Sequence, residues 1–412
     1  MVKELKHTEF GDIPSDWSIQ TFEETFKVLS NNTLSRDNLN YRGGAVRNIH
    51  YGDILIKFSE VLNCEKDEIP YVNDLSLLTS STQLLQDGDV IIADTAEDDT
   101  VGKVTEVQHL ADKKLVSGLH TIPCRVKKGE FVPGWLGYYM NSQLYHNQIL
   151  PFVTGIKVSS ISKSAIAETL ILIPPKDIQE DIVKGLLDVD ELISALEKEI
   201  EKKKNIGNTL LDELLTGKRR LVGFDGEWTI QCMKNYVDFQ VGFPFDSNLF
   251  NNDGVGLRLI KNRDLKSDDQ VYYTNEDVSL DYLVNDGDIL VGMDGEFIPC
   301  LWKKGKALLN QRVGRLIFKK KLYPVFAYYA FQKPLYKLQN GTGATTVKHL
   351  SHGDIQKLEI LMPPTIEEQI QIATLLLEAN QEIEVLNFKS DKYKKIKQGM
   401  MNDLLTGKIR LA

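Results

Sequence analysis

The sequence predicts a mixed α/β (α+β) protein made by internal duplication. Two globular domains of similar fold would be separated by an antiparallel pair of long coiled-coil helices, with pseudo-twofold symmetry. The first observation is a repeated octapeptide, LLTGKRRL at Leu214–Leu221 and LLTGKIRL at Leu404–Leu411. The second is that each copy closes a helix-like run that opens after a double proline, Pro174-Pro175 or Pro363-Pro364. The offset between the two boxes exceeds that between the two double prolines by a single position, so a whole segment was duplicated with one residue gained.

The duplication divides the chain into four segments. A length of 412 residues is enough for two or three domains with cores of their own. We expect a first globular domain at 1–173, a central long helix at 174–222, a second globular domain at 223–362 and a C-terminal long helix at 363–412.

The two long helices carry apolar residues spaced alternately four and three apart, which is the coiled-coil pattern. The stripe of the first helix recurs in the second at the offset that relates Leu214 to Leu404, with a weaker stretch around Ser390–Lys397. At 1.5 Å per residue, each helix would be on the order of 55 Å long. A lone helix cannot bury such a stripe. We therefore expect the duplicates to pair through Ile182, Leu186, Val189, Ile193, Leu196, Ile200, Ile372, Leu376, Ile383 and Leu386.

The charges of these helices indicate how they pair. In the first helix acidic residues predominate over 177–201, and Lys202, Lys203 and Lys204 follow. In the second, acidic residues over 367–384 precede lysines over 389–397. Acidic residues early in a helix also suit the helix dipole, which is a simpler explanation. An antiparallel pair sets each acidic half against a basic half, so we expect antiparallel packing with one globular domain at each end.

The two globular segments repeat the same order of features with little sequence identity. Both contain three features in the same order: a turn and strand with a tryptophan, a strand entered through an Asp-Gly-Asp turn, and an amphipathic helix rich in tyrosine. In the first segment these lie at Gly11–Phe22, Leu84–Ala93 and Phe131–Leu150. In the second segment they lie at Gly223–Met233, Leu283–Gly292 and Leu322–Leu338. Because the helices are alike and the globular segments differ, we expect a common frame that carries two different recognition domains.

Composition is that of an ordinary globular protein, with 42% hydrophobic and 26% charged residues. The net charge of -9 argues weakly against a nucleic-acid partner, unless basic residues are concentrated locally. The four cysteines form no Cys-x-x-Cys pair, which fits a reducing, cytoplasmic location without a zinc site or disulfide framework. Since no apolar run approaches the length of a membrane span, we expect no membrane partner.

Motifs for catalysis are missing from the sequence. Neither Gly217-Lys218 nor Gly407-Lys408 has the upstream glycine of a phosphate-binding loop. Neither double proline belongs to an Asn/Asp-Pro-Pro-Tyr/Phe methyltransferase motif. His349 and His352 lack enough neighbouring ligands for a metal site. We therefore expect a non-catalytic chain with no metal and no cofactor of its own.

The arrangement resembles the specificity (S) subunit family of type I restriction–modification enzymes. The resemblance rests on the GDIPSDW opening, the two Asp-Gly-Asp turns, PPKDIQEDIV and PPTIEEQIQIA at the helix starts, and the two LLTGK boxes. One departure is Gln179-Glu180 where the second helix has Glu368-Gln369.

The resemblance implies a division of labour within a larger complex. Two target-recognition domains would each read one half of a split DNA sequence. The helices would set the spacer and dock two methyltransferase subunits, and through them the restriction/translocase subunits. S-adenosylmethionine, ATP and magnesium would be bound only by those partner subunits.

Locally basic segments supply the candidate DNA-binding residues. Arginine suits guanine, asparagine and glutamine suit adenine, and lysine mostly meets phosphate. The candidates are Arg42, Arg47 and Asn48 in the first domain, Lys261, Asn262, Arg263, Gln311 and Arg312 in the second, and Lys157 and Lys348 in two Gly-rich loops, Lys157–Ser160 and Thr345–Lys348. Each could instead be a solvated surface residue. An alternative for the whole chain is a scaffold that joins partner subunits through its coiled coil without reading DNA.

Overall fold

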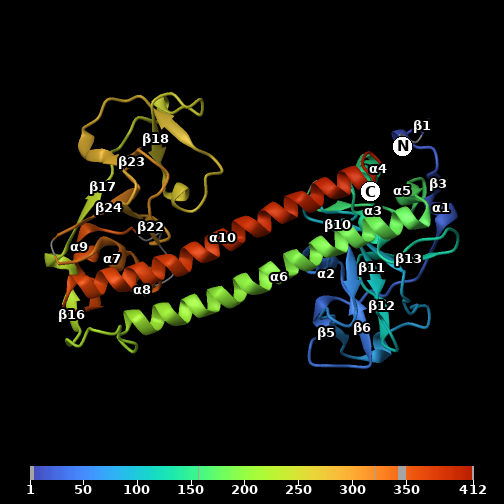
Figure 1. Ribbon diagram of the computed structural model, residues 1–412, viewed down its shortest axis with the longest axis horizontal. Coiled ribbons are helices and arrows are strands. Elements are labelled where there is room, and N and C mark those ends of the chain that lie inside the picture. The colour runs from blue at the N-terminus through green and yellow to red at the C-terminus, as the bar shows by residue number, and fades with distance from the viewer. Residues whose placement is uncertain (1–3, 156, 320, 342–348, 411–412) are drawn as a thin grey trace. The chain divides into compact units, whose positions relative to one another are not determined.

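The computed structural model describes residues 4–155, 157–319, 321–341 and 349–410. The chain forms two compact units, Met1–Glu197 with Phe388–Ala412, and Lys198–Asn387. The division falls within both long helices, α6 (Lys176–Leu215) and α10 (Ile366–Leu404) (Figure 1). Each unit therefore holds one globular head, the N-terminal half of one helix and the C-terminal half of the other. We call residues 4–175 the first head and residues 216–365 the second head.

The first head contains two main sheets. A five-stranded sheet has the order β4-β13-β9-β11-β7, antiparallel except for β7, which is parallel to β11. Its strands are β4 (Phe26–Val28), β7 (Val61–Asn63), β9 (Val90–Ala93), β11 (Val104–Gln108) and β13 (Thr121–Val126). A four-stranded sheet has the order β12-β6-β8-β5, from β5 (Leu39–Asn40), β6 (Val46–Ile49), β8 (Tyr71–Val72) and β12 (Lys114–Ser117).

Shorter elements complete the first head. Three strand pairs are β1 (Leu5–Thr8) with β2 (Gly11–Pro14), β3 (Ser18–Thr21) with β15 (Leu170–Ile173), and β10 (Thr95–Ala96) with β14 (Ser159–Ser160). The helices are α1 (Phe22–Thr25), α2 (Tyr51–Ile56), α3 (Trp135–Met140), α4 (Gln143–Ile149) and α5 (Lys163–Ala167). Short 3₁₀ turns lie at η1 (Arg36–Asn38), η2 (Leu75–Leu77) and η3 (Leu150–Phe152).

The second head repeats this architecture. One sheet has the order β17-β24-β21-β22, from β17 (Val237–Val241), β21 (Ile289–Gly292), β22 (Pro299–Leu301) and β24 (Val313–Phe318). The other has the order β19-β18-β23-β20, from β18 (Leu257–Ile260), β19 (Tyr272–Thr274), β20 (Leu283–Val284) and β23 (Ala307–Leu309). The remaining elements are β16 (Thr229–Cys232) paired with β25 (Glu359–Met362), α7 (Pro324–Ala330), α8 (Gln332–Asn340), α9 (His352–Lys357), η4 (Met233–Asn235), η5 (Ser247–Leu249), η6 (Asn262–Leu265) and η7 (Leu280–Tyr282).

The two heads share a common set of paired strands, although the first head adds β7 and the edge strands β5 and β20 differ in place. The order β4-β13-β9-β11 corresponds to β17-β24-β21-β22, and the parallel pair β6–β12 corresponds to β18–β23. In both heads the parallel pair is flanked by an antiparallel strand, β8 or β19. The predicted duplication is thus confirmed in the heads, although their sequences have diverged.

The tyrosine-rich segments differ from the single helices that we expected. In the first head the segment divides into α3 and α4. Asn141 ends α3, because its amide donates to the carbonyls of Gly137 and Val104, both at 2.7 Å. Ser142 then starts α4, with its hydroxyl accepting from the backbone N of Tyr145 at 3.3 Å. The second head is divided in the same way, into α7 and α8.

The Asp-Gly-Asp turns are structural in both heads. Asp89 accepts from the backbone N of Gln86 at 2.8 Å and pairs with Arg125 at 2.7 Å. Asp288 pairs with Arg315 at 3.2 Å in the corresponding place. Each turn therefore ties the start of a central strand to its neighbour. Arg315, which lies in a basic segment of the sequence, is used within the fold.

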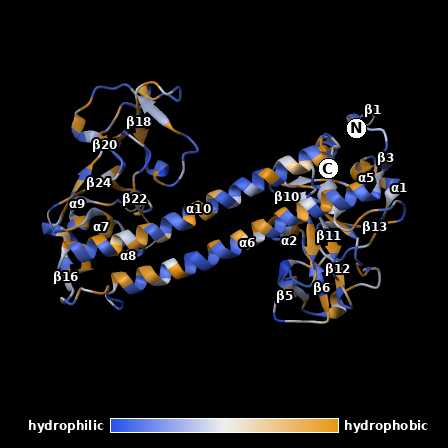
Figure 2. Ribbon diagram, viewed as in Figure 1, coloured by the Kyte–Doolittle hydropathy of each residue, from blue (hydrophilic) through white to orange (hydrophobic). Residues whose placement is uncertain are grey.

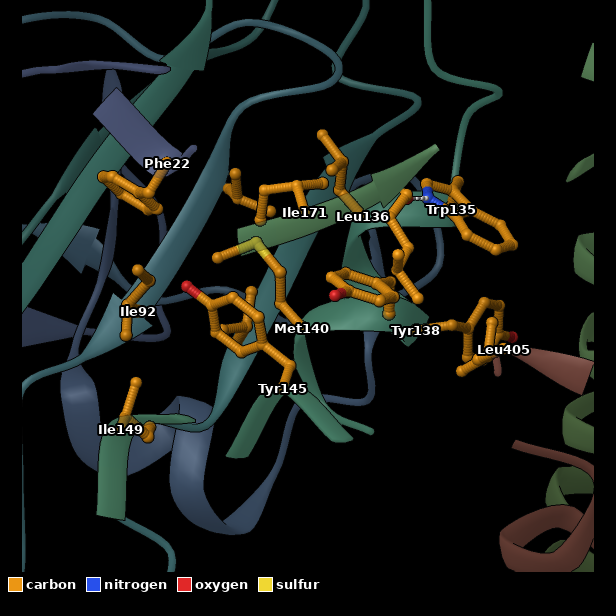
Figure 3. Close-up of a cluster of buried hydrophobic side chains, with 14 of the residues drawn as sticks. Phe22, Ile92, Trp135, Leu136, Tyr138, Met140, Tyr145, Ile149, Ile171 and Leu405 are labelled. Carbon is orange, nitrogen blue, oxygen red and sulfur yellow. Dashed lines mark hydrogen bonds between the residues drawn. The ribbon is translucent and has the colours of Figure 1, made fainter. Parts of the chain in front are cut away.

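One large core joins the first head to both long helices. Aromatic residues of α3, including Trp135 and Tyr138, share a buried cluster with Leu405, which directly follows α10 (Figure 3). The same cluster includes Ile182 of α6 and Leu404 of α10. A corresponding cluster in the second unit includes Leu214, Ile372, Ala373 and Leu376. Figure 2 shows apolar residues recurring along both long helices.

The predicted helix seam is buried to different extents. Ile182, Leu186, Ile372 and Leu376 are buried within the head cores. The buried residues outside those cores are Ile193, Leu196 and Ile200, and the half-buried ones are Val189, Ile383 and Leu386. The residues at the ends of the seam therefore pack into the heads, and those in its middle are buried or half-buried outside the head cores.

The helices pair antiparallel within each unit. In the first unit, the carboxylates of Asp190 and Glu197 lie 2.7 Å from the ammonium groups of Lys397 and Lys394, respectively. In the second unit, Lys203 lies 2.6 Å from Glu382. Residue numbers thus rise along α6 as they fall along α10, which confirms the orientation that the charges predicted.

Each LLTGK box ends its helix. Gly217 and Gly407 have φ of 67° and 71°, a left-handed conformation in which a helix commonly terminates. A Cβ atom on Gly217 would lie 3.5 Å from the ring of Trp228, and one on Gly407 would lie 3.3 Å from the ring of Trp17. Each box therefore fixes the end of its helix against the tryptophan of the head in the same unit.

A buried glutamine near the start of each helix fixes the other end. Gln179 accepts from the backbone N of Val132 at 2.9 Å, and Gln369 accepts from that of Tyr323 at 2.8 Å. The two glutamines are related by the same offset as the LLTGK boxes, so they are equivalent. The departure in the first helix is therefore Ile178 at the position of Glu368, and Gln179 itself is retained.

Along the described chain, no helix combines the length and apolarity needed to cross a bilayer.

Candidate nucleic-acid interface

In the second head, predicted residues converge on Asp294, which follows the central strand β21. Its carboxylate accepts from Arg312 Nη1 at 2.6 Å and contacts His349 Nδ1 at 2.9 Å. Its backbone carbonyl accepts from the amide of Asn262 at 2.8 Å. Burial raises the pKa of Asp294, but bonding to His349 and Arg312 outweighs it and leaves that pKa below its usual range. Gln311 is exposed beside Arg312 in the segment between β23 and β24.

Two further candidates of the second head lie on a tyrosine. The ammonium of Lys261 lies 3.3 Å from the centroid of the Tyr272 ring, and the guanidinium carbon of Arg263 lies 5.2 Å from it. Burial lowers the pKa of Lys261. A cation is attracted to the face of an aromatic ring, and the Arg263 side chain held in this way is still 47% exposed. Four of the predicted residues of this head thus form two groups, Asn262 and Arg312 on Asp294, and Lys261 and Arg263 on Tyr272.

The first head corrects part of the prediction. Asn48 has 0% of its surface exposed, and its side-chain oxygen accepts from Asn32 at 2.8 Å. Arg47 is half-buried, donates to the carbonyl of Cys64 at 2.6 Å and lies over the Tyr71 ring. Both belong to β6, which lies between β12 and β8 in its sheet, so neighbouring strands flank it on both sides. Asn48 is therefore a core residue, and Arg42 alone of the three is exposed.

The first head has a counterpart of the Asn262 segment that sequence reasoning missed. Arg47–Asp53 (RNIHYGD) corresponds to Arg258–Asp264 (RLIKNRD), because each runs from the end of an equivalent strand, β6 or β18, into a short helix, α2 or η6. The final aspartate of each segment donates its backbone N to a carbonyl three residues earlier, in both cases at 2.9 Å. His50 and Tyr51 thus occupy the positions of Lys261 and Asn262. Aligning the two halves over this segment would have identified them.

These residues form a polar cluster in the first head. The ring of Tyr51 lies 4.6 Å from that of His50 and 5.2 Å from that of His120. His120 Nδ1 lies 3.4 Å from the Asp94 carboxylate and 3.3 Å from the Thr95 hydroxyl. The cluster therefore follows β9, the strand that corresponds to β21.

A partly buried ion pair adjoins this cluster. Arg36 binds both oxygens of Asp53 at 2.9 Å, and Asp53 is almost fully buried. Hydrogen bonding to Asp53 raises the pKa of Arg36. Burial, and then the charge of Arg36, lower the pKa of His50, so its neutral form is favoured.

The two Gly-rich loops are described unequally. Lys157 is exposed, next to β14. Lys348 and the loop Thr345–Lys348 lie outside the described residues.

Within the part of the chain that is described, no group of three or more His, Cys, Asp or Glu side chains could hold a metal ion. The four cysteines are free thiols, and burial raises the pKa of Cys64 to about 11.

Sequence comparisons identify the family. The pattern of the family described as "Type I restriction modification DNA specificity domain" matches residues 14–204 and 227–394. The type I restriction enzyme MjaX specificity subunit of Methanocaldococcus jannaschii is 25% identical, over 99% of this chain and 97% of that relative. The EcoBI specificity subunit of Escherichia coli is 31% identical, over 48% of this chain and 42% of that relative.

Solved structures show the same fold. The S subunit of the type I restriction–modification system from M. genitalium superimposes with a TM-score of 0.61 at 14% identity, covering 98% of this chain and 99% of that one. A chain from a structure on assembly and conformational transition of the type I R-M system gives 0.53 at 15% identity, covering 96% and 99%. Together with the two family matches, which cover most of the sequence, this shows that the chain belongs to the type I restriction modification DNA specificity family and carries its domain twice.

Proposed function

We propose that each head of this specificity subunit reads one half of a bipartite DNA target. One observation carries the proposal. At the edge where β9 and β21 end, two heads with a common set of paired strands present different side chains, while the helix anchors are alike. Arg312, Asn262 and Gln311 offer donors and acceptors suited to guanine and adenine edges in the major groove, and His120 and Tyr51 offer a different set. Two different reading surfaces on one repeated frame are what a split, asymmetric target requires.

Partner subunits would supply the chemistry. We infer that two methyltransferase subunits and, through them, restriction/translocase subunits join the complex, and that S-adenosylmethionine, ATP and magnesium bind there. Within the described residues, the polar clusters resemble recognition surfaces more than a nucleophile–base arrangement. Exposed apolar residues on the helices, among them Val385 (60% exposed) and Phe388 (74%), offer a place for partner proteins. The chain itself would be non-catalytic and act in the cytoplasm.

Selection from random DNA tests this function against the scaffold alternative. The chain would be reconstituted with its methyltransferase partners and used to select duplexes from a random pool at a fixed salt concentration. We expect two short enriched motifs separated by a spacer of constant length. Enrichment without sequence preference would favour a scaffold that does not read DNA.

The helix pair would set the spacer. A second Leu-Leu-Thr-Gly inserted after Gly217 should lengthen α6 by about 6 Å, at 1.5 Å per residue. Since B-DNA rises about 3.4 Å per base pair, the spacer should grow by one or two pairs, with both half-sites unchanged. Methylation mapping would measure this. An unchanged spacer in an active complex would mean that the insertion loops out at the helix cap and that helix length does not set the spacer.

A further inference from the structure

We propose that Asp294 positions Arg312 to read a guanine in the half-site of the second head, and that the Asp94–His120 pair occupies the same reading position in the first head. This rests on the proposed function, because it assigns roles within the DNA-reading surface. β9 and β21 are equivalent central strands, and the chain leaving each carries a carboxylate within two residues.

Asp294 lies beneath the groups that it binds. Its side chain is 24% exposed, whereas Arg312 is 59% exposed and His349 is 55% exposed. One carboxylate oxygen accepts from Arg312 and the other contacts His349. Asn262 holds the backbone of Asp294 from the neighbouring η6 turn. The carboxylate of Asp294, whose backbone Asn262 holds in place, thus orients the side chains of Arg312 and His349, both of which are exposed to solvent.

Stability alone does not explain this arrangement. Ion pairs with an exposed partner contribute little to folding, because solvent screens them and ordering long side chains costs entropy. For recognition, the same ordering is useful, since a side chain held before binding loses less freedom on binding. Arg312 uses Nη1 for Asp294, which leaves Nη2 and Nε to face a partner. A guanidinium fork presented in this way suits the O6 and N7 acceptors of guanine.

The first head has the same layout with a different reading group. His120 Nδ1 faces Asp94, so the ring presents Nε2 outward, with Tyr51 beside it. His120 also has a φ of 55°, in the left-handed region that residues other than glycine seldom adopt. Such backbone strain persists where the surroundings impose it, and it is concentrated at functional sites. A single imidazole nitrogen cannot make the two-bond contact of an arginine, so the two heads would prefer different bases.

Arg312→Lys and Asp294→Asn test the pairing in the full chain, reconstituted with its methyltransferase partners. Arg312→Lys keeps the charge and removes the fork. We expect preference at one guanine of the second half-site to fall at least tenfold, with the first half-site unchanged. Asp294→Asn should weaken the preference at the same base pair. Selection from random duplexes and methylation mapping provide the measurements.

Two further variants sharpen the test. His120→Gln should change preference at one base pair of the first half-site only. Lys319→Gln removes an exposed ion pair with Asp238 (2.9 Å) at the other end of β24 and should change neither half-site. Arg312→Lys with an unchanged second half-site would overturn the proposal while leaving bipartite recognition intact. Equal weakening on all sequences would assign Arg312 to phosphate and would also overturn it. A wild-type complex without sequence preference would instead refute the proposed function.

Discussion

The ammonium of Lys397, in the C-terminal half of α10, lies 2.7 Å from the carboxylate of Asp190 in the N-terminal half of α6. Glu60 of the first head binds the same ammonium at 2.5 Å, and Tyr138 donates to Asp190 at 2.6 Å. Burial lowers the pKa of Lys397, but the two carboxylates outweigh it, and that pKa is raised. This cluster links both helices and the head within the first unit.

The duplicated positions in the second unit lack these charges. Gly207 and Asn380 are the duplicates of Lys397 and Asp190, and Asn380 donates to the Tyr329 hydroxyl at 2.9 Å. A cavity of about 310 Å³, lined by both residues, occupies this place. At these duplicated positions a hydrogen bond from Asn380 to Tyr329 therefore takes the place of the Asp190–Lys397 ion pair.

Lys397→Met should destabilise the first unit. The change leaves Glu60 and Asp190, 18% and 24% exposed, without their shared cation, so the loss should approach the cost of breaking a buried ion pair, about 3–5 kcal/mol. Urea unfolding of the full chain, with hydrogen exchange to locate the effect, measures this. Lys394→Met is the matched control, because its pair with Glu197 is half exposed and should contribute at most about 1 kcal/mol. Equal losses for the two variants would show that the buried cluster has no special role.

Leu196→Asp should disrupt the helix pair. Leu196 is 4% exposed in the middle of α6, and burying an unpaired charge costs several kcal/mol. We expect a large loss of thermal stability and poor assembly with methyltransferase partners. Leu187→Asp, at an exposed apolar position of the same helix, should leave the folded chain stable. A Leu196→Asp chain that melts like the parent would contradict the pairing.

The first head should lose stability in mild acid. Burial lowers the pKa of His50 and of His146, so both bind protons more weakly in the folded chain than in the unfolded one. Protonation therefore favours unfolding as the pH falls below the ordinary histidine value of about 6.5. Urea unfolding at pH 7.5 and pH 5.5 should show the loss, with hydrogen exchange placing it in the first head.

Substitution of His50 isolates its share of that pH dependence. His50→Asn can still cap α2, where the His50 ring now accepts from the backbone N of Gly52 at 3.2 Å, and it carries no titrating group. The loss between the two pH values should therefore shrink in this variant. His7→Asn, at an exposed histidine, should leave it unchanged. Identical pH dependence in the His50→Asn chain would contradict a role for that histidine.

The long helices were predictable because duplication and heptad spacing are visible in sequence. The charge order also predicted their orientation, which the Asp190–Lys397 and Lys203–Glu382 pairs confirm. Local capping was harder to predict, since Ser142 interrupts an amphipathic pattern that continues on both sides of it. Gln179-Glu180 had been compared with Glu368-Gln369, pair against pair. The offset between the LLTGK boxes instead makes Gln179 the equivalent of Gln369 and Ile178 that of Glu368.

The exposure of the candidate residues was predictable where polar residues follow a strand, and not where they lie within one. Asn262 follows β18 and Arg312 precedes β24, and both side chains lie near Asp294. Asn48 and Arg47 are within β6, where neighbouring strands decide which side chains are covered. Residue type suits both groups for reading bases, but only tertiary pairing determines which side chains are exposed.

Exchange of one head tests independent reading most directly. Residues 31–128 would be replaced by the matching segment of a relative with a known target, and the complex would be analysed by methylation mapping of genomic DNA. We expect a new sequence in one half-site, with the other half-site and the spacer length unchanged. A change in both half-sites, or in neither while the complex stays active, would contradict the claim that each head reads its own half of the target.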